Sequence, residues 1–233
     1  MGASALVITA DDGCNPVESA LEEVGIEVHR CSIGRFSLVA ALESRPSAIF
    51  VDARSDFRRA VQLCISLRAV EAMGAVRVIA ITNSGTPQER FRLYEAGADD
   101  CWAVPLDSRE LVERARELVR APLRDLPRVL RCGDVVVDPD RYTVSYSGHS
   151  AKLTAMQLKL LAHLISNPGM VFSYQRLLEE VWGKPDGDER MVRACIVRLR
   201  RALTAARGAP GIIESVRGGG YAFNPHKARQ AAS

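Results

Sequence analysis

The sequence predicts a doubly wound α/β domain with a five-stranded parallel sheet, followed by a smaller α+β domain. Three observations lead to this prediction. Short apolar runs alternate with amphipathic stretches through the first 120 residues, a segment with two prolines then interrupts the pattern, and a different pattern follows. The chain has 233 residues, which is enough for two domains of ordinary size.

The first half alternates between two periods. Its short apolar runs suit strands that are buried on both faces, and they lie at residues 5–8, 28–29, 48–51, 76–81 and 101–104. The stretches between them have helical spacing, at 16–24, 36–42, 60–70, 89–96 and 108–119. In such a sheet the functional crevice lies beyond the carboxyl ends of the strands. Thr9, Asp52 and Thr82 stand at or beside those ends.

The composition excludes several classes of protein. A hydrophobic content of 47% and a charged content of 25% are ordinary globular values, which argues against a disordered chain. No apolar run approaches the roughly 18 residues of a membrane helix, and no basic segment precedes an apolar one at the N-terminus. The six cysteines form no C-x-x-C pair and lie near no cluster of histidines, so we expect buried or idle thiols and no metal site. We also expect no cofactor. These features predict a cytoplasmic protein.

The second half begins after a linker. Residues 121–129 contain two prolines and no periodicity, so we expect domains at 1–120 and 130–226, with a tail at 227–233. Short strands are predicted within 129–131, 135–137, 142–146 and 151–153, then helices at 154–165, 173–182 and 188–205, and a hairpin at 212–223. Three helices followed by a hairpin predict a winged helix-turn-helix.

The charge is divided between the two halves. Residues 1–120 carry 14 Arg and no Lys against 18 acidic residues, a net charge of −4, whereas residues 121–233 carry 13 Arg and 4 Lys against 10 acidic residues, a net charge of +7. A basic half favours an anionic partner such as nucleic acid. A chance difference is the alternative interpretation.

The third helix of the second half supports a nucleic-acid partner. On a helical wheel Val192, Ile196, Leu199 and Leu203 form one apolar stripe. The opposite arc carries basic and small side chains, namely Arg190, Arg193, Ala194, Val197, Arg198 and Arg201. Arg200 lies at the edge of this arc. An α-helix fits the major groove of B-DNA, where arginine contacts guanine or phosphate. The alternative is a solvated basic face on a structural helix.

The predicted hairpin carries a further basic residue. Arg217 stands beside Gly218–Gly220, which places a guanidinium at the hairpin tip, where it suits a narrow minor groove. A nucleotide-binding glycine loop is the weaker interpretation, because the strand–loop–helix context is missing.

Four segments resemble the winged-helix domain of OmpR/PhoB-type response regulators. They are Leu153–Leu161 (LTAMQLKLL), Ser173–Gly183 (SYQRLLEEVWG), Arg198–Leu203 (RLRRAL) and Val216–Tyr221 (VRGGGY). The first half resembles the receiver domain of the same family. There, Asp52 ends the third strand, Thr82 ends the fourth, and Gly97–Asp100 precedes the fifth.

This resemblance implies a transcriptional regulator that binds direct-repeat half-sites on double-stranded DNA as a homodimer. It places Arg193, Val197 and Arg198 toward the bases, Arg190, Arg200 and Arg201 toward phosphates, and Arg217 in the minor groove. The loop 183–188 matches the segment that such activators present to RNA polymerase. Met191, Arg193 and Cys195 differ from the residues usual in this helix, so the DNA sequence preference does not carry over.

The receiver resemblance makes Asp52 the phosphoacceptor position, but its supporting residues are missing. Receivers hold Mg²⁺ with an acid pair at the end of the first strand and pair the phosphate with a lysine at the end of the fifth. In this chain Thr9 and Ala10 stand at the positions of the acid pair, and Val104 stands at the position of the lysine. Asp11 and Asp12 lie two residues after the positions expected for the acid pair. The first lysine of the whole chain is Lys152. We therefore expect Asp52 to be phosphorylated poorly or not at all.

Arg54 indicates a different use of the same pocket, which would consist of Thr9, Asp11, Asp12, Asp52, Arg54 and Thr82. Two residues after Asp52, Arg54 can turn back onto the carboxylate while Thr9 donates a hydrogen bond. The segment Val51–Arg54 is similar to the GlnR-like atypical branch of the family. We hypothesise a fixed, phosphate-free site, with the alternative that Asp52 is only a solvated strand end.

The resemblance also implies dimerisation through the fourth helix, fifth strand and fifth helix. We expect cross-subunit ion pairs and an apolar centre there, from Arg90, Leu93, Asp99, Asp100, Leu111, Glu113, Arg114 and Arg116. The expected dimer forms without phosphorylation.

Four functions remain to be compared. The leading one is a sequence-specific regulator that works without phosphorylation, and its nearest alternative is a conventional regulator switched at Asp52. A phosphorelay intermediate and a scaffold that holds nucleic acid nonspecifically are the others. The four histidines are dispersed and form no nucleophile–base pair, so we expect no enzyme activity. We also expect no small-molecule substrate and, because no apolar run is long enough to span a bilayer, no membrane partner.

Overall fold

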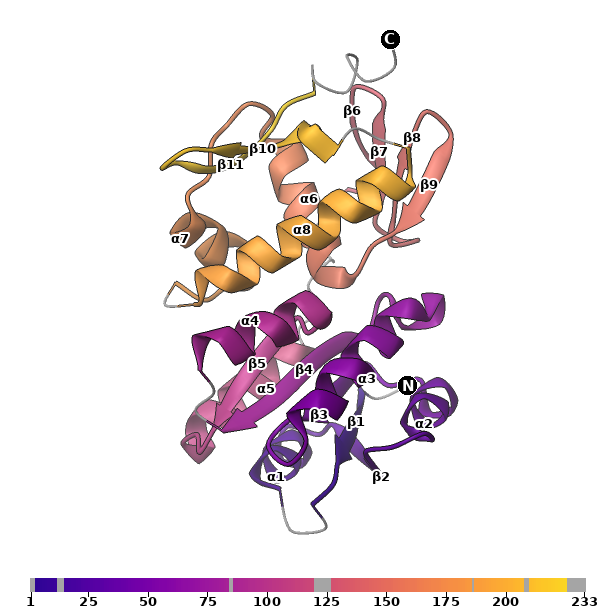
Figure 1. Cartoon of the computed structure of the whole chain (residues 1–233), viewed down its shortest axis with the longest axis vertical. Coiled ribbons are helices and arrows are strands. Elements are labelled where there is room, and N and C mark those ends of the chain that lie inside the picture. The colour runs from indigo at the N-terminus through magenta and orange to yellow at the C-terminus, as the bar shows by residue number, and fades with distance from the viewer. Residues whose placement is uncertain are drawn as a thin grey trace. The chain divides into compact units, whose positions relative to one another are not determined.

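Figure 1 shows a computed structural model of the chain, which describes residues 3–11, 15–83, 86–119, 127–185, 187–207 and 210–225. The chain divides into two compact units, residues 1–121 and 122–233. Of the expected linker at 121–129, only residues 127–129 are described; Asp12 and the expected tail at 227–233 also lie outside the described residues.

The first unit is a parallel sheet with strand order β2-β1-β3-β4-β5 (Figure 1). Its strands are β1 (Ser4–Thr9), β2 (Glu27–Ser32), β3 (Ala48–Asp52), β4 (Arg77–Asn83) and β5 (Asp100–Val104). Helices α1 (Pro16–Glu23) and α5 (Ser108–Val119) pack together, while α2 (Ser37–Ser44), α3 (Phe57–Ala69) and α4 (Pro87–Ala96) form a second neighbouring series, with a short turn η1 (Glu71–Met73) after α3. The predicted five-stranded, doubly wound domain is confirmed.

Burial explains which strands the sequence showed clearly. β1 and β3 lie inside the sheet and β3 is buried along its whole length, so the runs at 5–8 and 48–51 are continuously apolar. β2 lies at the edge and pairs only with β1, and none of its side chains is fully buried. An edge strand needs few apolar residues, which is why only residues 28–29 indicated it.

The second unit begins with a four-stranded antiparallel sheet of β6 (Leu130–Cys132), β7 (Val135–Asp138), β8 (Thr143–Tyr146) and β9 (His149–Lys152). Helix α6 (Ala155–Ser166) follows, then α7 (Tyr174–Leu177), which continues into a π-helical turn, η2 (Leu178–Trp182). The long helix α8 (Glu189–Ala205) leads through a short turn, η3 (Pro210–Ile212), to the hairpin of β10 (Ile213–Val216) and β11 (Gly220–Phe223) (Figure 1). The predicted winged-helix arrangement is confirmed.

Side-chain caps start each of these helices. Thr154 accepts a hydrogen bond from the Gln157 amide, and the Gln157 side chain accepts one from the Thr154 amide, which completes a capping box at α6. Ser173 accepts from the amide of Arg176 at α7, and Asp188 accepts from the amide of Arg190 at α8.

The hairpin, hereafter the wing, is held against the segment before α7. Phe172 and Tyr221 exchange two backbone hydrogen bonds, of 2.8 and 3.0 Å. Gly220 has a φ of +118°, and a Cβ there would overlap the carbonyl oxygen of Phe172. The glycine therefore permits a close approach of two backbone segments.

Candidate functional site

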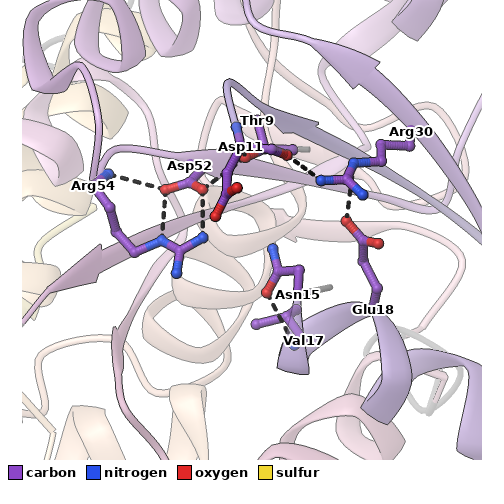
Figure 2. Close-up of polar contacts among 8 residues, drawn as sticks. All are labelled: Thr9, Asp11, Asn15, Val17, Glu18, Arg30, Asp52 and Arg54. Atoms are coloured by element: carbon purple, nitrogen blue, oxygen red, sulfur yellow. Dashed lines mark hydrogen bonds and ion pairs between the residues drawn. The ribbon is translucent and has the colours of Figure 1, made fainter. Parts of the chain in front are cut away.

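Polar side chains gather beyond the carboxyl edge of the parallel sheet. Thr9 ends β1, Asp52 ends β3, and Thr82 lies in the last part of β4; all three are buried. Because parallel strands end at the same edge, the sheet brings these residues to the crevice in which α/β folds bind ligands. Figure 2 shows the part of this pocket formed by Thr9, Asp11, Asp52 and Arg54.

The carboxylate of Asp52 is surrounded by donors. Arg54 donates from its backbone amide and from Nε to Oδ1, at 3.0 and 2.9 Å. Its Nη2 donates to Oδ2 at 2.7 Å, and the Thr9 hydroxyl donates to the same oxygen at 2.8 Å (Figure 2). The predicted convergence of Thr9, Asp52 and Arg54 is therefore present in the structure.

These contacts decide the ionisation of Asp52. Burial raises the pKa of its carboxyl, but the hydrogen bonds from Arg54 and Thr9, together with the charge of Arg54, outweigh burial and hold the pKa below its ordinary value. The same pairing raises the pKa of Arg54. The pair is consequently ionised at neutral pH, with a fully buried carboxylate and a guanidinium side chain that is 22% exposed.

The loop after β1 is attached to a neighbouring strand. The amide of Asp11 donates to the Thr9 hydroxyl at 3.0 Å, so this hydroxyl links the loop to Asp52. Arg30 on β2 donates to the carbonyl oxygen of Asp11 and lies 3.6 Å from a carboxylate oxygen of Glu18 (Figure 2). Asp11 is exposed, while Asp12 falls outside the described residues.

Thr82 occupies the expected position at the same edge. It is 3% exposed, and its hydroxyl has no hydrogen-bond partner within the described part of the chain. Val104, which ends β5, has the position where the resemblance expected a lysine.

The second candidate site is the exposed face of α8. Val192, Ile196, Leu199 and Leu203 are buried, so the predicted apolar stripe is confirmed. Ala194 is also buried, at 1% exposure, so its expected place on the basic arc opposite the apolar stripe was wrong. The reason is that the packed side of this helix is broader than the apolar stripe, since Met191 and Cys195 are buried as well.

The exposed face of α8 is narrow and basic. With about 100° per residue, Arg190, Arg193, Val197 and Arg201 fall within roughly 80° of one another. Arg193, Val197 and Arg201 are exposed, and Arg190 is half-buried beside Asp188, 3.2 Å away. Arg198 is half-buried and lies about 140° around the helix from Arg193. The structure therefore separates Arg198 from the other two residues that were expected to face the bases.

Arg200 departs from its expected role. Its Nε donates to the carbonyl oxygen of Ile213 at 3.1 Å, and its Nη2 donates to the same carbonyl and to the Ser215 hydroxyl, the latter at 3.0 Å. The guanidinium thus binds the first strand of the wing. Its hydrogen bonds are made within the domain, which corrects the expectation that it serves a phosphate.

Arg217 is exposed in the turn between β10 and β11, where it was expected. The turn is shaped by packing as well as by glycine: a Cβ at Gly219 would come within 3.1 Å of Val216 and 3.2 Å of Val171. Glycine at positions 219 and 220 therefore permits close packing within the wing, whereas a Cβ at Gly218 would meet nothing within 4 Å.

The expected dimer surface is largely used inside the monomer. Leu93 and Leu111 are 0% and 1% exposed, so they belong to the core of the first unit and are not an apolar centre for a dimer. This part of the prediction was wrong because the apolar stripes of both helices face the sheet.

The charged residues of that surface also have partners within the chain. Asp99 is buried in an ion pair with Arg68, Asp100 accepts from the indole nitrogen of Trp102 at 2.9 Å, and Arg114 lies 2.7 Å from Glu110. Glu113 is exposed and lies 3.6 Å from Arg109. Arg116 is exposed and Arg90 is half-buried.

The sequence did not single out Tyr174, Tyr221 or Arg68, although Tyr174 contacts both Arg193 and Tyr221 and Arg68 pairs with Asp99. Tyr174 and Tyr221 stood inside the quoted motifs, where an aromatic residue reads as core. Arg68 lies near the end of α3, and its guanidinium also donates to the carbonyls of Gly97, Met73 and Val76. No local sequence pattern indicated these contacts, because they depend on how the elements pack.

The described residues contain no cluster of His, Cys, Asp and Glu side chains suited to a metal ion. Within the described ranges, no helix combines the length and apolar character that a bilayer crossing requires.

Comparison with known proteins connects both units to one family. Residues 148–223 match the family described as "Transcriptional regulatory protein, C terminal". The chain is 33% identical over 205 residues to the phosphate regulon transcriptional regulatory protein PhoB of Rhizobium meliloti (strain 1021), covering 87% of this chain and 90% of PhoB. It is 31% identical over 224 residues to the transcriptional regulatory protein AfsQ1 of Streptomyces coelicolor, covering 95% and 98%.

A solved structure agrees with the two-unit fold. A mutant of RitR superposes with a TM-score of 0.70 at 21% identity, covering 96% of this chain and 99% of RitR. This similarity concerns the fold alone. The relatives above share at least 30% identity with this chain over most of their length. From their similarity and from the match of its C-terminal domain, the chain belongs to the OmpR/PhoB-type response regulators, a family of transcriptional regulatory proteins.

Proposed function

We propose that the chain is a sequence-specific regulator that reads double-stranded DNA with α8 in the major groove and the wing in the minor groove. The support comes from the exposed face of α8, where Arg193, Val197 and Arg201 project from a helix whose other side is packed. A helix of this kind fits the major groove, and exposed arginines supply contacts to bases and phosphates. Arg217 at the turn of the wing adds a basic group suited to a minor groove.

We further propose that this regulator works without phosphorylation of Asp52. One observation carries the proposal: four hydrogen bonds, from Arg54 and Thr9, converge on the Asp52 carboxylate. A carboxylate offers about four lone-pair sites, so its accepting capacity is filled. A carboxylate oxygen of Asp52 must lose one of these hydrogen bonds before it can attack a phosphoryl donor. The Arg54 guanidinium also neutralises the negative charge of the carboxylate, which makes the oxygen a weaker nucleophile.

A Mg²⁺ ion, which the receiver fold implies, does not fit the residues present. Mg²⁺ prefers carboxylate oxygens in octahedral geometry. Thr9 and Ala10 stand where the acid pair is expected, and both oxygens of Asp52 accept hydrogen bonds from Arg54. Arg54 thus supplies from within the chain the positive charge that the ion would otherwise bring.

Mass spectrometry tests this proposal. The intact chain is incubated with acetyl phosphate and Mg²⁺, beside Asp52→Asn and Arg54→Ala, with a conventional receiver domain as a positive control. We expect no phosphoryl adduct on the wild-type chain while the control receiver is modified. A stoichiometric adduct on the wild type that Asp52→Asn abolishes would contradict the proposal and favour a regulator switched at Asp52.

A competition assay separates a sequence-specific regulator from a scaffold that holds nucleic acid nonspecifically. DNA enriched by the chain from a random pool is challenged with random competitor at fixed salt, because salt sets the nonspecific affinity. We expect the enriched DNA to survive an excess of competitor. Equal displacement from enriched and random DNA would favour the scaffold.

We also propose a homodimer on direct-repeat half-sites, with the loop 183–188 facing RNA polymerase. Family membership supports both statements, whereas the burial of Leu93 and Leu111 requires a different set of contact residues. Light scattering at micromolar concentration tests the dimer, and a monomeric mass without DNA would count against it.

A further inference from the structure

We propose that Tyr174 is a specificity-determining residue, because its ring positions the Arg193 guanidinium for base reading. The inference rests on the proposed DNA-binding function and deepens it. Tyr174 itself is assigned no base contact. It acts through Arg193, from a different helix.

Arg193 and Tyr174 form a cation–π pair. The guanidinium carbon of Arg193 lies 4.8 Å from the centre of the Tyr174 ring, within the distance at which such pairs attract. The other partner of Arg193 is Glu189, one turn earlier on α8, at 3.5 Å. That ion pair is exposed on both sides and is therefore weak, so the ring is the more defined of the two supports.

Tyr174 is itself fixed from two sides. It is the first residue of α7, directly after the Ser173 cap, so its backbone is set by the start of that helix. Its ring meets the ring of Tyr221 edge to face, with centroids 5.4 Å apart and planes at 82°. Tyr221 is buried in the wing and paired through its backbone with Phe172.

The hydroxyl groups add a second link between the two tyrosines. Burial and a hydrogen bond with Tyr174 raise the pKa of Tyr221 to about 12, so the Tyr221 phenol stays neutral at physiological pH. Arg200 also contacts Tyr221: its guanidinium carbon lies 5.9 Å from the centre of the Tyr221 ring. The two tyrosines therefore connect two arginines of α8 with the start of α7 and the wing.

This arrangement matters because of how arginine reads a base. Recognition of guanine requires two N–H groups at the edge of a planar guanidinium, and a flexible side chain on an exposed helix face offers many other orientations. A ring that packs against the guanidinium restricts those orientations and leaves N–H groups at the edge able to donate. Val197 lies within the same exposed arc but is apolar, and Arg201 has an exposed side chain without a ring contact among the described residues.

Binding-site selection with the full chain tests the inference. The wild type selects sites from a random double-stranded DNA pool, and Arg193→Ala identifies the base position that loses its preference. Dissociation constants are then measured for the four bases at that position with the wild type, Tyr174→Phe and Tyr174→Leu. Tyr174→Phe is the matched control, since it keeps the ring and removes only the hydroxyl.

We expect Tyr174→Leu to reduce discrimination at the Arg193 position by about 3- to 10-fold, without changing preferences elsewhere or the affinity for random DNA. Tyr174→Phe should retain discrimination within about twofold, and Tyr174→Leu combined with Arg193→Ala should discriminate no less than Arg193→Ala alone.

Two results would overturn the inference: unchanged discrimination in Tyr174→Leu, or an equal loss at every position, which indicates a structural role. If the wild type enriches no motif at all, the proposed function itself fails.

Discussion

The Arg54 guanidinium lies against both carboxylate oxygens of Asp52, two residues earlier in the chain, at 2.9 and 2.7 Å. A buried carboxylate that loses such a partner keeps the cost of its desolvation. Loss of Arg54 would therefore destabilise the first unit, and the intact pair occupies the oxygen atoms that a phosphoacceptor needs.

We predict that Arg54→Ala lowers the free energy of unfolding by about 2–4 kcal/mol, because it leaves a buried charge without its cation. Adding Asp52→Asn removes that charge, so the double variant should be more stable than Arg54→Ala alone. Urea denaturation measures both. Arg59→Ala is the control, because the Arg59–Asp56 pair is exposed and should contribute about 0–1 kcal/mol. A double variant less stable than Arg54→Ala would contradict this explanation.

The same carboxylate predicts a pH dependence. Its pKa in the folded chain lies below the ordinary value of 3.8, so the unfolded chain takes up the proton first as the pH falls. The contribution of the ionised Asp52 carboxylate to stability is therefore present in full above the unfolded-state pKa of 3.8, and it is lost as the pH falls through the lower pKa of the folded chain. We expect the stability difference between the wild type and Asp52→Asn to shrink in that acid range. A difference that grows there would show the opposite sign.

The buried pair between Arg68 and Asp99 predicts a large effect on stability outside both candidate sites. The Arg68 side chain is 11% exposed and that of Asp99 is 4% exposed, and the guanidinium also binds three backbone carbonyls. Arg68→Ala should cost about 3–5 kcal/mol in unfolding free energy. Arg109→Ala, from the exposed pair with Glu113, should cost about 0–1 kcal/mol. Similar costs in the two variants would mean that burial does not govern these pairs.

The wing predicts a difference between two glycines. At Gly220 a Cβ overlaps the Phe172 carbonyl, whereas at Gly218 nothing lies within 4 Å and only a φ of +71° is strained. Gly218→Ala should cost about 1 kcal/mol, and Gly220→Ala more, because it must separate the paired backbones of Phe172 and Tyr221. Thermal unfolding of both variants measures this. Equal melting temperatures of the two variants would mean that the close approach of Gly220 to the Phe172 carbonyl does not limit the stability of the wing.

Arg200 and Arg201 should behave differently although they are adjacent. Arg201 is exposed, so Arg201→Ala should weaken binding to all DNA sequences alike, reduce the salt slope by about one, and leave stability unchanged. Arg200→Ala removes the contacts with Ile213 and Ser215, so it should lower the melting temperature as well as DNA affinity. Titrations at several salt concentrations, paired with thermal unfolding, test this. An unchanged melting temperature in Arg200→Ala would restore its expected role at phosphate.

The sequence by itself determined the order of elements in both units and the residue types of the receiver pocket. Periodicity and capping residues are local, so they located the helices and the inner strands, and a two-residue spacing was enough to expect Arg54 on Asp52. The sequence alone also showed that Val104 stands where receiver domains have a lysine at the end of the fifth strand.

Only the tertiary structure decided which side chains remain exposed and available for contacts with a partner. Leu93, Leu111 and Asp99 looked suited to a dimer surface, but packing against the sheet and pairing with Arg68 bury them. Arg200 differs from its exposed neighbour Arg201 only in facing the wing, and Tyr174 meets Arg193 across two helices. Contacts between residues distant in the chain depend on how the elements pack, and a local sequence pattern does not contain that information.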